Sequence, residues 1–206
     1  MNVKICGITT VSDGLLAAEM GASSIGMVFW PSSPRFVDPV RARAIVRALP
    51  AHVKTVAVFV NQMDDALAIA QDVGVGAVQL HGDERPGEYA GFSLPVIKSV
   101  AVRGRETLVE AAAIPADVMV LLDAHDPVRR GGTGTVIDWS IAAEIAGTRP
   151  VILSGGLTAS NVADAVRAVR PQGIDVSSGV ECQPGCKDPG KLRALFAALN
   201  GVQETR

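Results

Sequence analysis

Short runs of hydrophobic, often β-branched residues recur along the chain and alternate with segments whose hydrophobic residues repeat at helical spacing. The runs predict eight strands, at residues 3–7, 24–29, 55–60, 77–80, 95–100, 118–122, 151–153 and 173–176. Strict alternation of strands and helices indicates a parallel sheet. Eight repeats favour a closed (β/α)8 TIM barrel, in a single domain over residues 1–206, rather than an open doubly wound sheet. No dinucleotide-binding fingerprint follows the first strand, which also disfavours the open sheet.

Capping residues mark where several helices begin. Thr10, with Asp13 three residues later, is typical of a helix N-terminus. Asp38-Pro39 and Asp188-Pro189 each combine a capping aspartate with a proline at the first helical position. The helical pattern at residues 86–90 is short and weak. We therefore expect only a short helix there.

The seventh and eighth strands both end in small residues, Ser154-Gly155-Gly156-Leu157 and Ser177-Ser178-Gly179-Val180. Without bulky side chains, backbone amides at these tips can approach a ligand closely. In a TIM barrel the loops after strands 7 and 8 are the usual place for a phosphate group. These two tips therefore predict a phosphate site.

Composition narrows the class of protein. The chain has 206 residues, of which 48% are hydrophobic, and a formal net charge of -2, so a basic surface for nucleic acid or anionic lipid is not expected. No hydrophobic run approaches the roughly 20 residues of a membrane span, and the N-terminus lacks the build of a signal peptide. Three cysteines without framework spacing favour a reducing, cytoplasmic location.

The active site of a TIM barrel forms at the C-terminal ends of its strands. Few polar residues are expected there: Cys6, Arg35, Asn61, His81, Asp123 and Asp175.

Cys6 has two readings, as a small buried hydrophobic residue or as a functional thiol that needs a nearby cation. Lys4 shares its strand face, but we expect it one layer deeper in the barrel or solvated. Asp123 either contacts a helix N-terminus or neighbouring cation, or acts as a general acid whose pKa is raised by the apolar barrel.

Other candidates carry weaker signals. Arg35, between Pro34 and Phe36, is either solvated or held rigidly enough to bind a carboxylate. His81 is as compatible with a core histidine as with a ligand contact. Lys98 is more consistent with a lysine that is paired or reaches solvent than with a Schiff base.

Two further motifs contain glycines or cysteines. Gly131-Gly132-Thr133-Gly134 lacks the Gly-Lys-Ser/Thr ending of a P-loop and is better interpreted as a lid over the barrel mouth. Cys182 and Cys186 have no neighbouring histidine in the sequence, so a zinc site is not expected.

Taken together, the motifs resemble those of the phosphoribosylanthranilate isomerase family along essentially the whole chain. The resemblance rests on Lys4-Ile5-Cys6-Gly7-Ile8-Thr9, Ser33-Pro34-Arg35-Phe36-Val37, Val78-Gln79-Leu80-His81-Gly82, Leu121-Leu122-Asp123, Gly131-Gly132-Thr133-Gly134 with Asp138-Trp139, Ser154-Gly155-Gly156-Leu157, and Asp175-Val176-Ser177-Ser178-Gly179-Val180-Glu181 with Pro184-Gly185 and Lys187-Asp188. Each motif is weak alone, and the ordered set is specific.

The resemblance implies an Amadori rearrangement in tryptophan biosynthesis, from N-(5-phosphoribosyl)anthranilate to 1-(2-carboxyphenylamino)-1-deoxyribulose 5-phosphate. By similarity, Asp123 protonates the furanose oxygen as general acid and Cys6 removes the C2 proton as general base. The substrate would be bound through its carboxylate by Arg35, through a sugar hydroxyl by Asp175, near His81, and through its phosphate by the amides of Gly155, Gly156, Ser177 and Ser178. The resemblance calls for no metal or organic cofactor, and it leaves monomer and homodimer open.

Three alternatives remain to be weighed. The bifunctional isomerase that also serves histidine biosynthesis uses two aspartates, which Cys6 argues against. A ribulose-phosphate epimerase needs several metal-binding histidines at strand tips, where only His81 is available. A non-catalytic sugar-phosphate binding module would have no reason to keep both Cys6 and Asp123.

Overall fold

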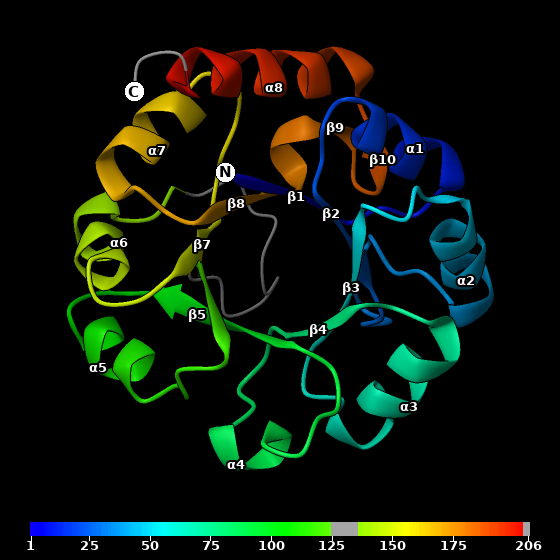
Figure 1. Ribbon diagram of the computed structural model, residues 1–206, viewed down its shortest axis with the longest axis horizontal. Helices are drawn as coiled ribbons and strands as arrows, with labels where there is room; N and C mark the ends of the chain where they lie inside the picture. The colour runs from blue at the N-terminus through cyan, green and yellow to red at the C-terminus, as the bar shows by residue number, and fades with distance from the viewer. Residues whose placement is uncertain (125–135, 204–206) are drawn as a thin grey trace.

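The fold is a closed barrel of eight parallel strands, in a computed structural model that describes residues 1–124 and 136–203. Each strand pairs with the next one in sequence, and the eighth closes on the first (Figure 1). The strands are β1 (Asn2–Cys6), β2 (Ser24–Val28), β3 (Lys54–Phe59), β4 (Ala77–Leu80), β5 (Val96–Val102), β6 (Met119–Ala124), β7 (Val151–Leu153) and β8 (Gly173–Val176). The predicted (β/α)8 barrel is therefore confirmed.

The helices surround the strands as an outer ring (Figure 1). They are α1 (Val11–Glu19), α2 (Pro39–Ala48), α3 (Met63–Val73), α4 (Pro86–Tyr89), α5 (Glu106–Ala112), α6 (Trp139–Ala146), α7 (Val162–Val169) and α8 (Pro189–Gln203). As its weak pattern predicted, α4 is a single turn. This leaves the barrel thinly covered outside β4 and β5.

The predicted capping residues begin their helices. The Thr10 hydroxyl accepts a hydrogen bond from the Asp13 amide at 3.1 Å, and the Asp38 carboxylate accepts one from the Arg41 amide at 2.9 Å. The Asp188 carboxylate does the same for the Lys191 amide at 2.9 Å. These side chains replace carbonyl partners that the first turn of a helix lacks.

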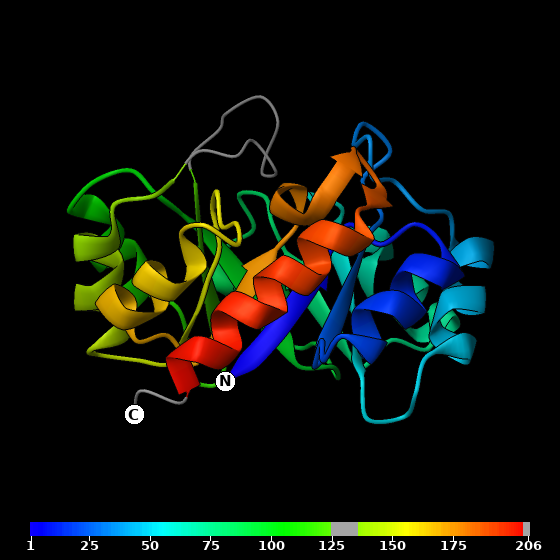
Figure 2. The same cartoon turned by 90° about the horizontal axis from the view of Figure 1, so that it is seen from above.

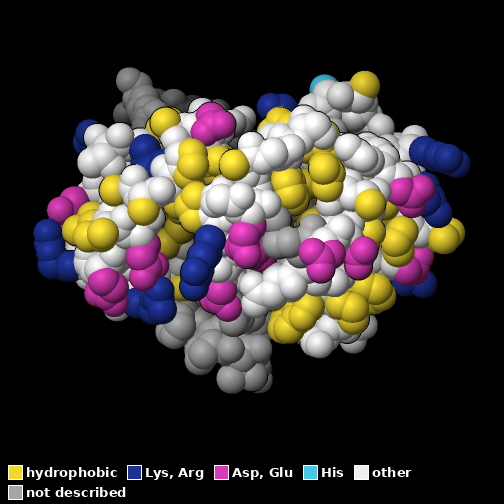
Figure 3. Space-filling view, turned by 90° about the horizontal axis from the view of Figure 1, so that it is seen from below, with side chains coloured by type: hydrophobic (Ala, Val, Ile, Leu, Met, Phe, Trp, Pro, Cys, Tyr) yellow, Lys and Arg dark blue, Asp and Glu magenta, His cyan; other side chains and the backbone are white. Residues whose placement is uncertain are grey.

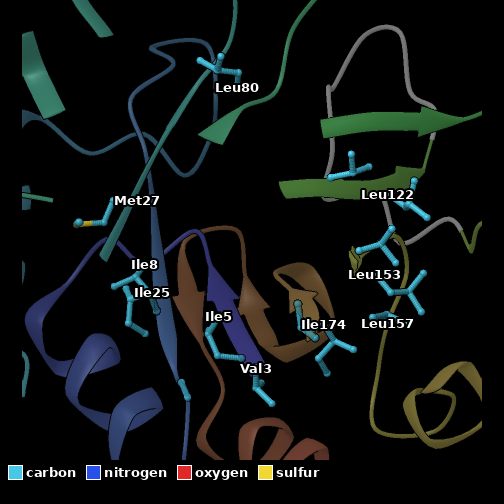
Figure 4. Packing of buried hydrophobic residues seen from close by; sticks show 14 of the residues in the cluster. Val3, Ile5, Ile8, Ile25, Met27, Leu80, Leu122, Leu153, Leu157 and Ile174 are labelled. Atoms are coloured by element: carbon cyan, nitrogen blue, oxygen red, sulfur yellow. The ribbon is translucent and has the colours of Figure 1, made fainter. Parts of the chain in front are cut away.

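The main hydrophobic core lies between the strands and the helices. Figure 4 shows part of it, in which Ile5 and Leu122 from two strands are fully buried. Because successive side chains of a strand point to opposite faces, the neighbours Cys6 and Asp123 point into the barrel instead. A separate buried cluster, which includes Leu121, lies on that inner face. Alternation therefore places the polar candidates above an apolar barrel floor.

One element was not predicted. Between β8 and α8 the chain forms a 3-10 turn, η1 (Ser178–Val180), and an antiparallel hairpin of β9 (Glu181–Gln183) and β10 (Cys186–Lys187). The hairpin lies at the end of the barrel away from the N-terminus (Figure 2). Strands of two and three residues are too short to show an alternating pattern, which is why the sequence did not reveal them.

None of the helices in the described ranges combines the length and the hydrophobicity that crossing a bilayer requires. On the face drawn in Figure 3, side chains of both charges are interspersed.

Candidate active site at the barrel mouth

A cavity of about 610 Å³ opens at the C-terminal ends of the strands. Its walls include Cys6, Arg35, Gln79, His81, Asp123 and Asp175. These residues are distant in sequence, and the parallel strands bring them to one end of the barrel. The structure thus gathers the predicted catalytic and substrate-binding side chains in one cavity. Asn61, the other polar residue expected at the strand ends, lies outside it and hydrogen-bonds Asp83 and Glu84.

Cys6 ends β1 and is packed against a buried ammonium group. It pairs across the sheet with Gly26 of β2. A Cβ atom on Gly26 would lie 2.8 Å from Cys6 Sγ and 2.9 Å from Lys4 Nζ, so both groups occupy the space that the glycine leaves. Lys4 is only 2% exposed. Lys4 is therefore not solvated: it starts two residues before Cys6 on β1, and its ammonium reaches the sulfur.

The surroundings of Cys6 act on its pKa in opposite directions. Burial raises it, the ammonium of Lys4 lowers it, the carboxylate of Asp175 raises it and Lys187 lowers it. The net result is a pKa above that of an ordinary thiol, because burial disfavours the thiolate. At neutral pH the unliganded site therefore holds Cys6 as a thiol.

Asp123, on β6, behaves in the opposite way. Burial raises its pKa, but the hydrogen bond and charge of His81, the Ala124 amide and the Ser154 hydroxyl lower it by more. His81 Nε2 lies 3.1 Å from Asp123 Oδ2. The expected rise in the pKa of Asp123 is thus wrong, because direct donors to the carboxylate outweigh the apolar surroundings.

A buried amide orients His81. Gln79 Nε2 lies 3.0 Å from His81 Nδ1. In the tautomer that donates from Nε2 to Asp123, His81 Nδ1 accepts a hydrogen bond from the Gln79 amide. Gln79 Oε1 is buried and has no hydrogen-bond partner among the described residues. Gln79, His81 and Asp123 thus form one hydrogen-bonded row across β4 and β6.

Arg35 is held by a carboxylate of the protein itself. Its Nε donates to Glu181 Oε1 at 2.9 Å and its Nη2 to Glu181 Oε2 at 2.6 Å. Lys187 Nζ donates to the same carboxylate at 2.8 Å and to the Cys6 carbonyl at 2.6 Å. Arg35 Nη1 has no hydrogen bond within the described part of the chain. The hairpin therefore fixes Arg35 at the cavity wall with one nitrogen left for a ligand.

Asp175 faces Cys6 from β8. Its Oδ1 accepts a hydrogen bond from Lys4 Nζ at 3.0 Å, and both side chains are buried. In the described ranges, no hydrogen bond to Asp175 Oδ2 is found. That oxygen is available for the sugar hydroxyl predicted for Asp175.

The predicted phosphate site is a small hollow between the tips of β7 and β8, with Asp123 at its edge. Gly155 and Gly156 have φ angles of +86° and +62°, a region that favours glycine. A Cβ atom on Gly179 would lie 1.9 Å from the Leu157 carbonyl, so this position also requires glycine. The predicted residues Ser177 and Ser178 line this hollow. The amides of Gly155, Gly156, Ser178 and the additional Gly179 make no hydrogen bond in the described ranges and can bind an anion.

Several other predictions have different outcomes. The motif Gly131-Gly132-Thr133-Gly134 lies outside the described residues. Lys98 donates to Glu84 at 2.9 Å and to the Gly82 carbonyl at 2.6 Å, in agreement with the paired reading. No three His, Cys, Asp or Glu side chains of the described ranges come close enough to hold a metal ion.

Sequence reasoning missed the partners of the candidate residues: Lys4 in this position, Gln79, Glu181 and Lys187. Lys4 is two residues from Cys6, and Gln79 is two residues from His81. Because side chains alternate between the faces of a strand, this spacing puts Lys4 and Gln79 on the inner face. Glu181 and Lys187 belong to the unpredicted hairpin, so no comparable signal was available.

The chain is similar to known proteins of one family along most of its length. The chain matches the family model described as N-(5'phosphoribosyl)anthranilate (PRA) isomerase over residues 3–198. A relative from Citrifermentans bemidjiense named N-(5'-phosphoribosyl)anthranilate isomerase is 45% identical over 201 residues, 97% of each chain. The phosphoribosyl anthranilate isomerase of Thermotoga maritima is 38% identical with a TM-score of 0.91, over 98% of this chain and 99% of that one. Another isomerase structure, in complex with reduced 1-(o-carboxyphenylamino)-1-deoxyribulose 5-phosphate, is 37% identical with a TM-score of 0.87, over 98% and 99%.

Proposed function

Because the chain belongs to the N-(5'-phosphoribosyl)anthranilate isomerase family of tryptophan biosynthesis, we propose that Cys6 and Asp123 are the base and the acid of its Amadori rearrangement. The observation that carries this proposal is their common cavity: a thiol from β1 and a carboxylate from β6 both point into the space where a ligand would lie. The substrate is N-(5-phosphoribosyl)anthranilate and the product is 1-(2-carboxyphenylamino)-1-deoxyribulose 5-phosphate.

Ring opening requires a proton on the furanose oxygen. Asp123 donates this proton, the bond between C1 and the ring oxygen breaks, and an iminium forms at C1. The unliganded site disfavours protonated Asp123, so the substrate must change the balance. A phosphate dianion in the hollow that Asp123 borders opposes the charge of the carboxylate and raises its pKa.

Isomerisation then requires loss of the proton on C2. Cys6, as the thiolate, takes this proton, and the electrons of the C–H bond neutralise the iminium to give an enolamine. The enolamine tautomerises to the ketone. The positive iminium favours the thiolate over the thiol, so the charge of the intermediate offsets the effect of burial on Cys6.

The remaining contacts position the substrate. Arg35 Nη1 binds the anthranilate carboxylate, and Glu181 keeps the guanidinium in place. Asp175 Oδ2 accepts a hydrogen bond from a sugar hydroxyl. The amides of Gly155, Gly156, Ser177 and Ser178 bind the phosphate. None of these steps calls for a metal or an organic cofactor.

A turnover assay tests the proposal. The substrate is generated in situ, and its fluorescence is followed with the wild-type protein, Cys6→Ala and Asp123→Asn. We expect each variant to lose about 10²- to 10⁴-fold in kcat, the usual contribution of general acid–base catalysis. Cys182→Ala and Asp164→Asn change exposed residues that do not line the cavity, and we expect these matched controls to keep full activity. A folded Cys6→Ala variant with wild-type turnover would show that the base is another group.

A further inference from the structure

The mechanism leaves a buried cation beside the base without a role. Lys4 projects into the barrel from the same strand as Cys6 and is almost completely buried. Burying an ammonium is unfavourable unless specific partners stabilise it. Its partners are the carboxylate of Asp175 and the thiol of Cys6.

We propose that Lys4 makes Cys6 available as a base by holding its ammonium group against the sulfur and stabilising the thiolate. This inference rests on the proposed role of Cys6. Lys4 acts by its charge and position and takes no proton itself. When the thiol ionises, its S–H bond breaks, the proton leaves to solvent, and the electron pair stays on the sulfur.

The packing around Gly26 is the first support. Of the side chains near a Cβ atom built at this position, Cys6 Sγ and Lys4 Nζ are the closest, at 2.8 and 2.9 Å. Strand β2 therefore carries a residue without a side chain where the two groups meet. Any other residue at position 26 would push at least one of them away.

The charge balance is the second support. Burial lowers the pKa of Lys4, but Asp175 and Cys6 raise it by more, so the ammonium stays charged at neutral pH. The ammonium of Lys4 is 3.0 Å from Asp175 Oδ1 and also lies beside the sulfur at Gly26. When Cys6 ionises, the thiolate becomes a second anion next to this cation, which stabilises it.

The other charged groups near Cys6 are less suited to this role. Lys187 approaches Cys6 through its backbone carbonyl and shares its charge with Glu181. Arg35 is also engaged by Glu181. His81 and Asp123 line the same cavity from β4 and β6 and contact each other. Lys4 is the cation whose ammonium lies beside the sulfur at Gly26, and Asp175 is the carboxylate that opposes its effect on the thiol.

The reactivity of Cys6 provides a test that does not depend on turnover. In a Cys182→Ser/Cys186→Ser background, Cys6 is the single thiol, and its alkylation by iodoacetamide is measured across pH. Replacing Lys4 by Met keeps the length of the side chain and removes the charge. We expect alkylation at neutral pH to slow by about 10- to 1000-fold, because an adjacent opposite charge typically shifts a pKa by about 1 to 3. The pH at which the alkylation rate of Cys6 is half its maximum should also increase.

A matched control is available on the outer face of the barrel. Lys98 is also a buried strand lysine paired with a carboxylate, but it contacts Glu84 and the Gly82 carbonyl rather than the thiol. Lys98→Met also leaves a buried carboxylate without its cation, and we expect it to leave the alkylation rate of Cys6 unchanged. If Lys98→Met slows the alkylation of Cys6 as much as Lys4→Met does, the inference is overturned.

A second variant keeps both charges and changes only their contact. Gly26→Ala places a methyl group within 3 Å of both the sulfur and the ammonium, so at least one of them must move away. We expect alkylation to slow at least tenfold, because a more distant cation stabilises the thiolate less. Gly76→Ala is the control, since a Cβ atom there would make an ordinary contact at 3.7 Å with the Thr55 carbonyl. Gly26→Ala also decides the question if Lys4→Met fails to fold.

Turnover measured on the same variants separates the two proposals. If alkylation and kcat fall together while KM changes little, both proposals stand. If alkylation slows and kcat does not, Lys4 controls the thiol but Cys6 is not the base, so the proposed function fails in that part. If kcat falls and alkylation does not, Lys4 acts through Asp175 and the inference is overturned, whereas the role of Cys6 stands.

Discussion

The two sides of the barrel mouth respond differently to the same burial. On the base side, Cys6 is 8% exposed, and on the acid side, Asp123 is 5% exposed. Burial favours the neutral form of both groups. At Cys6 this effect prevails and the pKa is raised, whereas at Asp123 the partners prevail and the pKa is lowered.

The difference lies in how the partners are arranged. The cations near Cys6 are shared with carboxylates: Lys4 with Asp175 and Lys187 with Glu181. Asp123 receives several hydrogen bonds on its charged group, from His81, the Ala124 amide and Ser154. Direct donors stabilise an anion more effectively than cations whose charge is already balanced. The protonation state of a buried group therefore follows its immediate contacts rather than its depth.

This arrangement gives the unliganded site a thiol and a carboxylate, the reverse of what the proposed chemistry uses. A substrate with a phosphate dianion next to Asp123 and an iminium next to Cys6 would reverse both states. The two sides are thus set for proton transfer by the charges of the ligand.

The largest expected effect comes from breaking the charge network of the base side. Lys187→Met leaves the buried carboxylate of Glu181 with one cation fewer and releases the Cys6 and Ser177 carbonyls. We expect the free energy of unfolding to fall by about 3 to 5 kcal/mol, as for other broken buried ion pairs. Urea denaturation measures this loss. The exposed pair of Arg103 and Glu110 is the control, and Arg103→Met should change stability by less than about 1 kcal/mol.

The corresponding change on the acid side should be smaller. His81→Leu removes a hydrogen bond to the buried Asp123 carboxylate, for which about 1 to 3 kcal/mol of lost stability is expected. Burial then dominates and the pKa of Asp123 rises, which a titration of the 13C-labelled carboxyl group by NMR would detect. His52→Leu, on an exposed histidine, is the control. An unchanged titration in His81→Leu would mean that other donors hold the carboxylate.

The free energy of unfolding should depend on Asp123 at acid pH and on Cys6 at alkaline pH. Asp123 has a lowered pKa in the folded state, so its contribution is present above the unfolded value of about 3.9 and is lost as pH falls through the folded pKa. Cys6 has a raised pKa, so its contribution is present below about 8.5 and is lost as pH rises through the folded pKa. Asp123→Asn should flatten the acid limb, and Cys6→Ala the alkaline limb, of thermal unfolding curves. The reverse pattern would contradict the comparison.

The smallest effect on stability is expected at Gln79. Gln79→Leu removes the donor to His81 Nδ1 together with a buried carbonyl oxygen that lacks a partner, so the free energy of unfolding should change by less than about 1 kcal/mol. Because the orientation of His81 is then less restricted, kcat should fall by about tenfold, part of the 10²- to 10⁴-fold that an acid supplies. Gln71→Leu, on an exposed glutamine of α3, controls for the substitution. Unchanged kcat in Gln79→Leu would limit this residue to packing.

Much of the fold followed from local patterns. Thr10 and Asp38 cap their helices because a capping side chain bonds to an amide two or three residues away. The strand ends at Cys6 and Asp123 were identifiable because a hydrophobic run stops there. The rule that all strand ends of a parallel barrel meet at one mouth then predicted which polar residues share a cavity.

The sequence by itself therefore determined the barrel, its order of strands and helices, and the residues at its mouth, since these depend on neighbours along the chain. Only the tertiary structure decided the state of each group. Lys4 reaches Cys6 because the adjacent strand has Gly26 at that register, and the pKa of Asp123 is lowered by His81 from a different strand. Electrostatic energies depend on distances between segments remote in sequence, and those distances exist only once the barrel has closed.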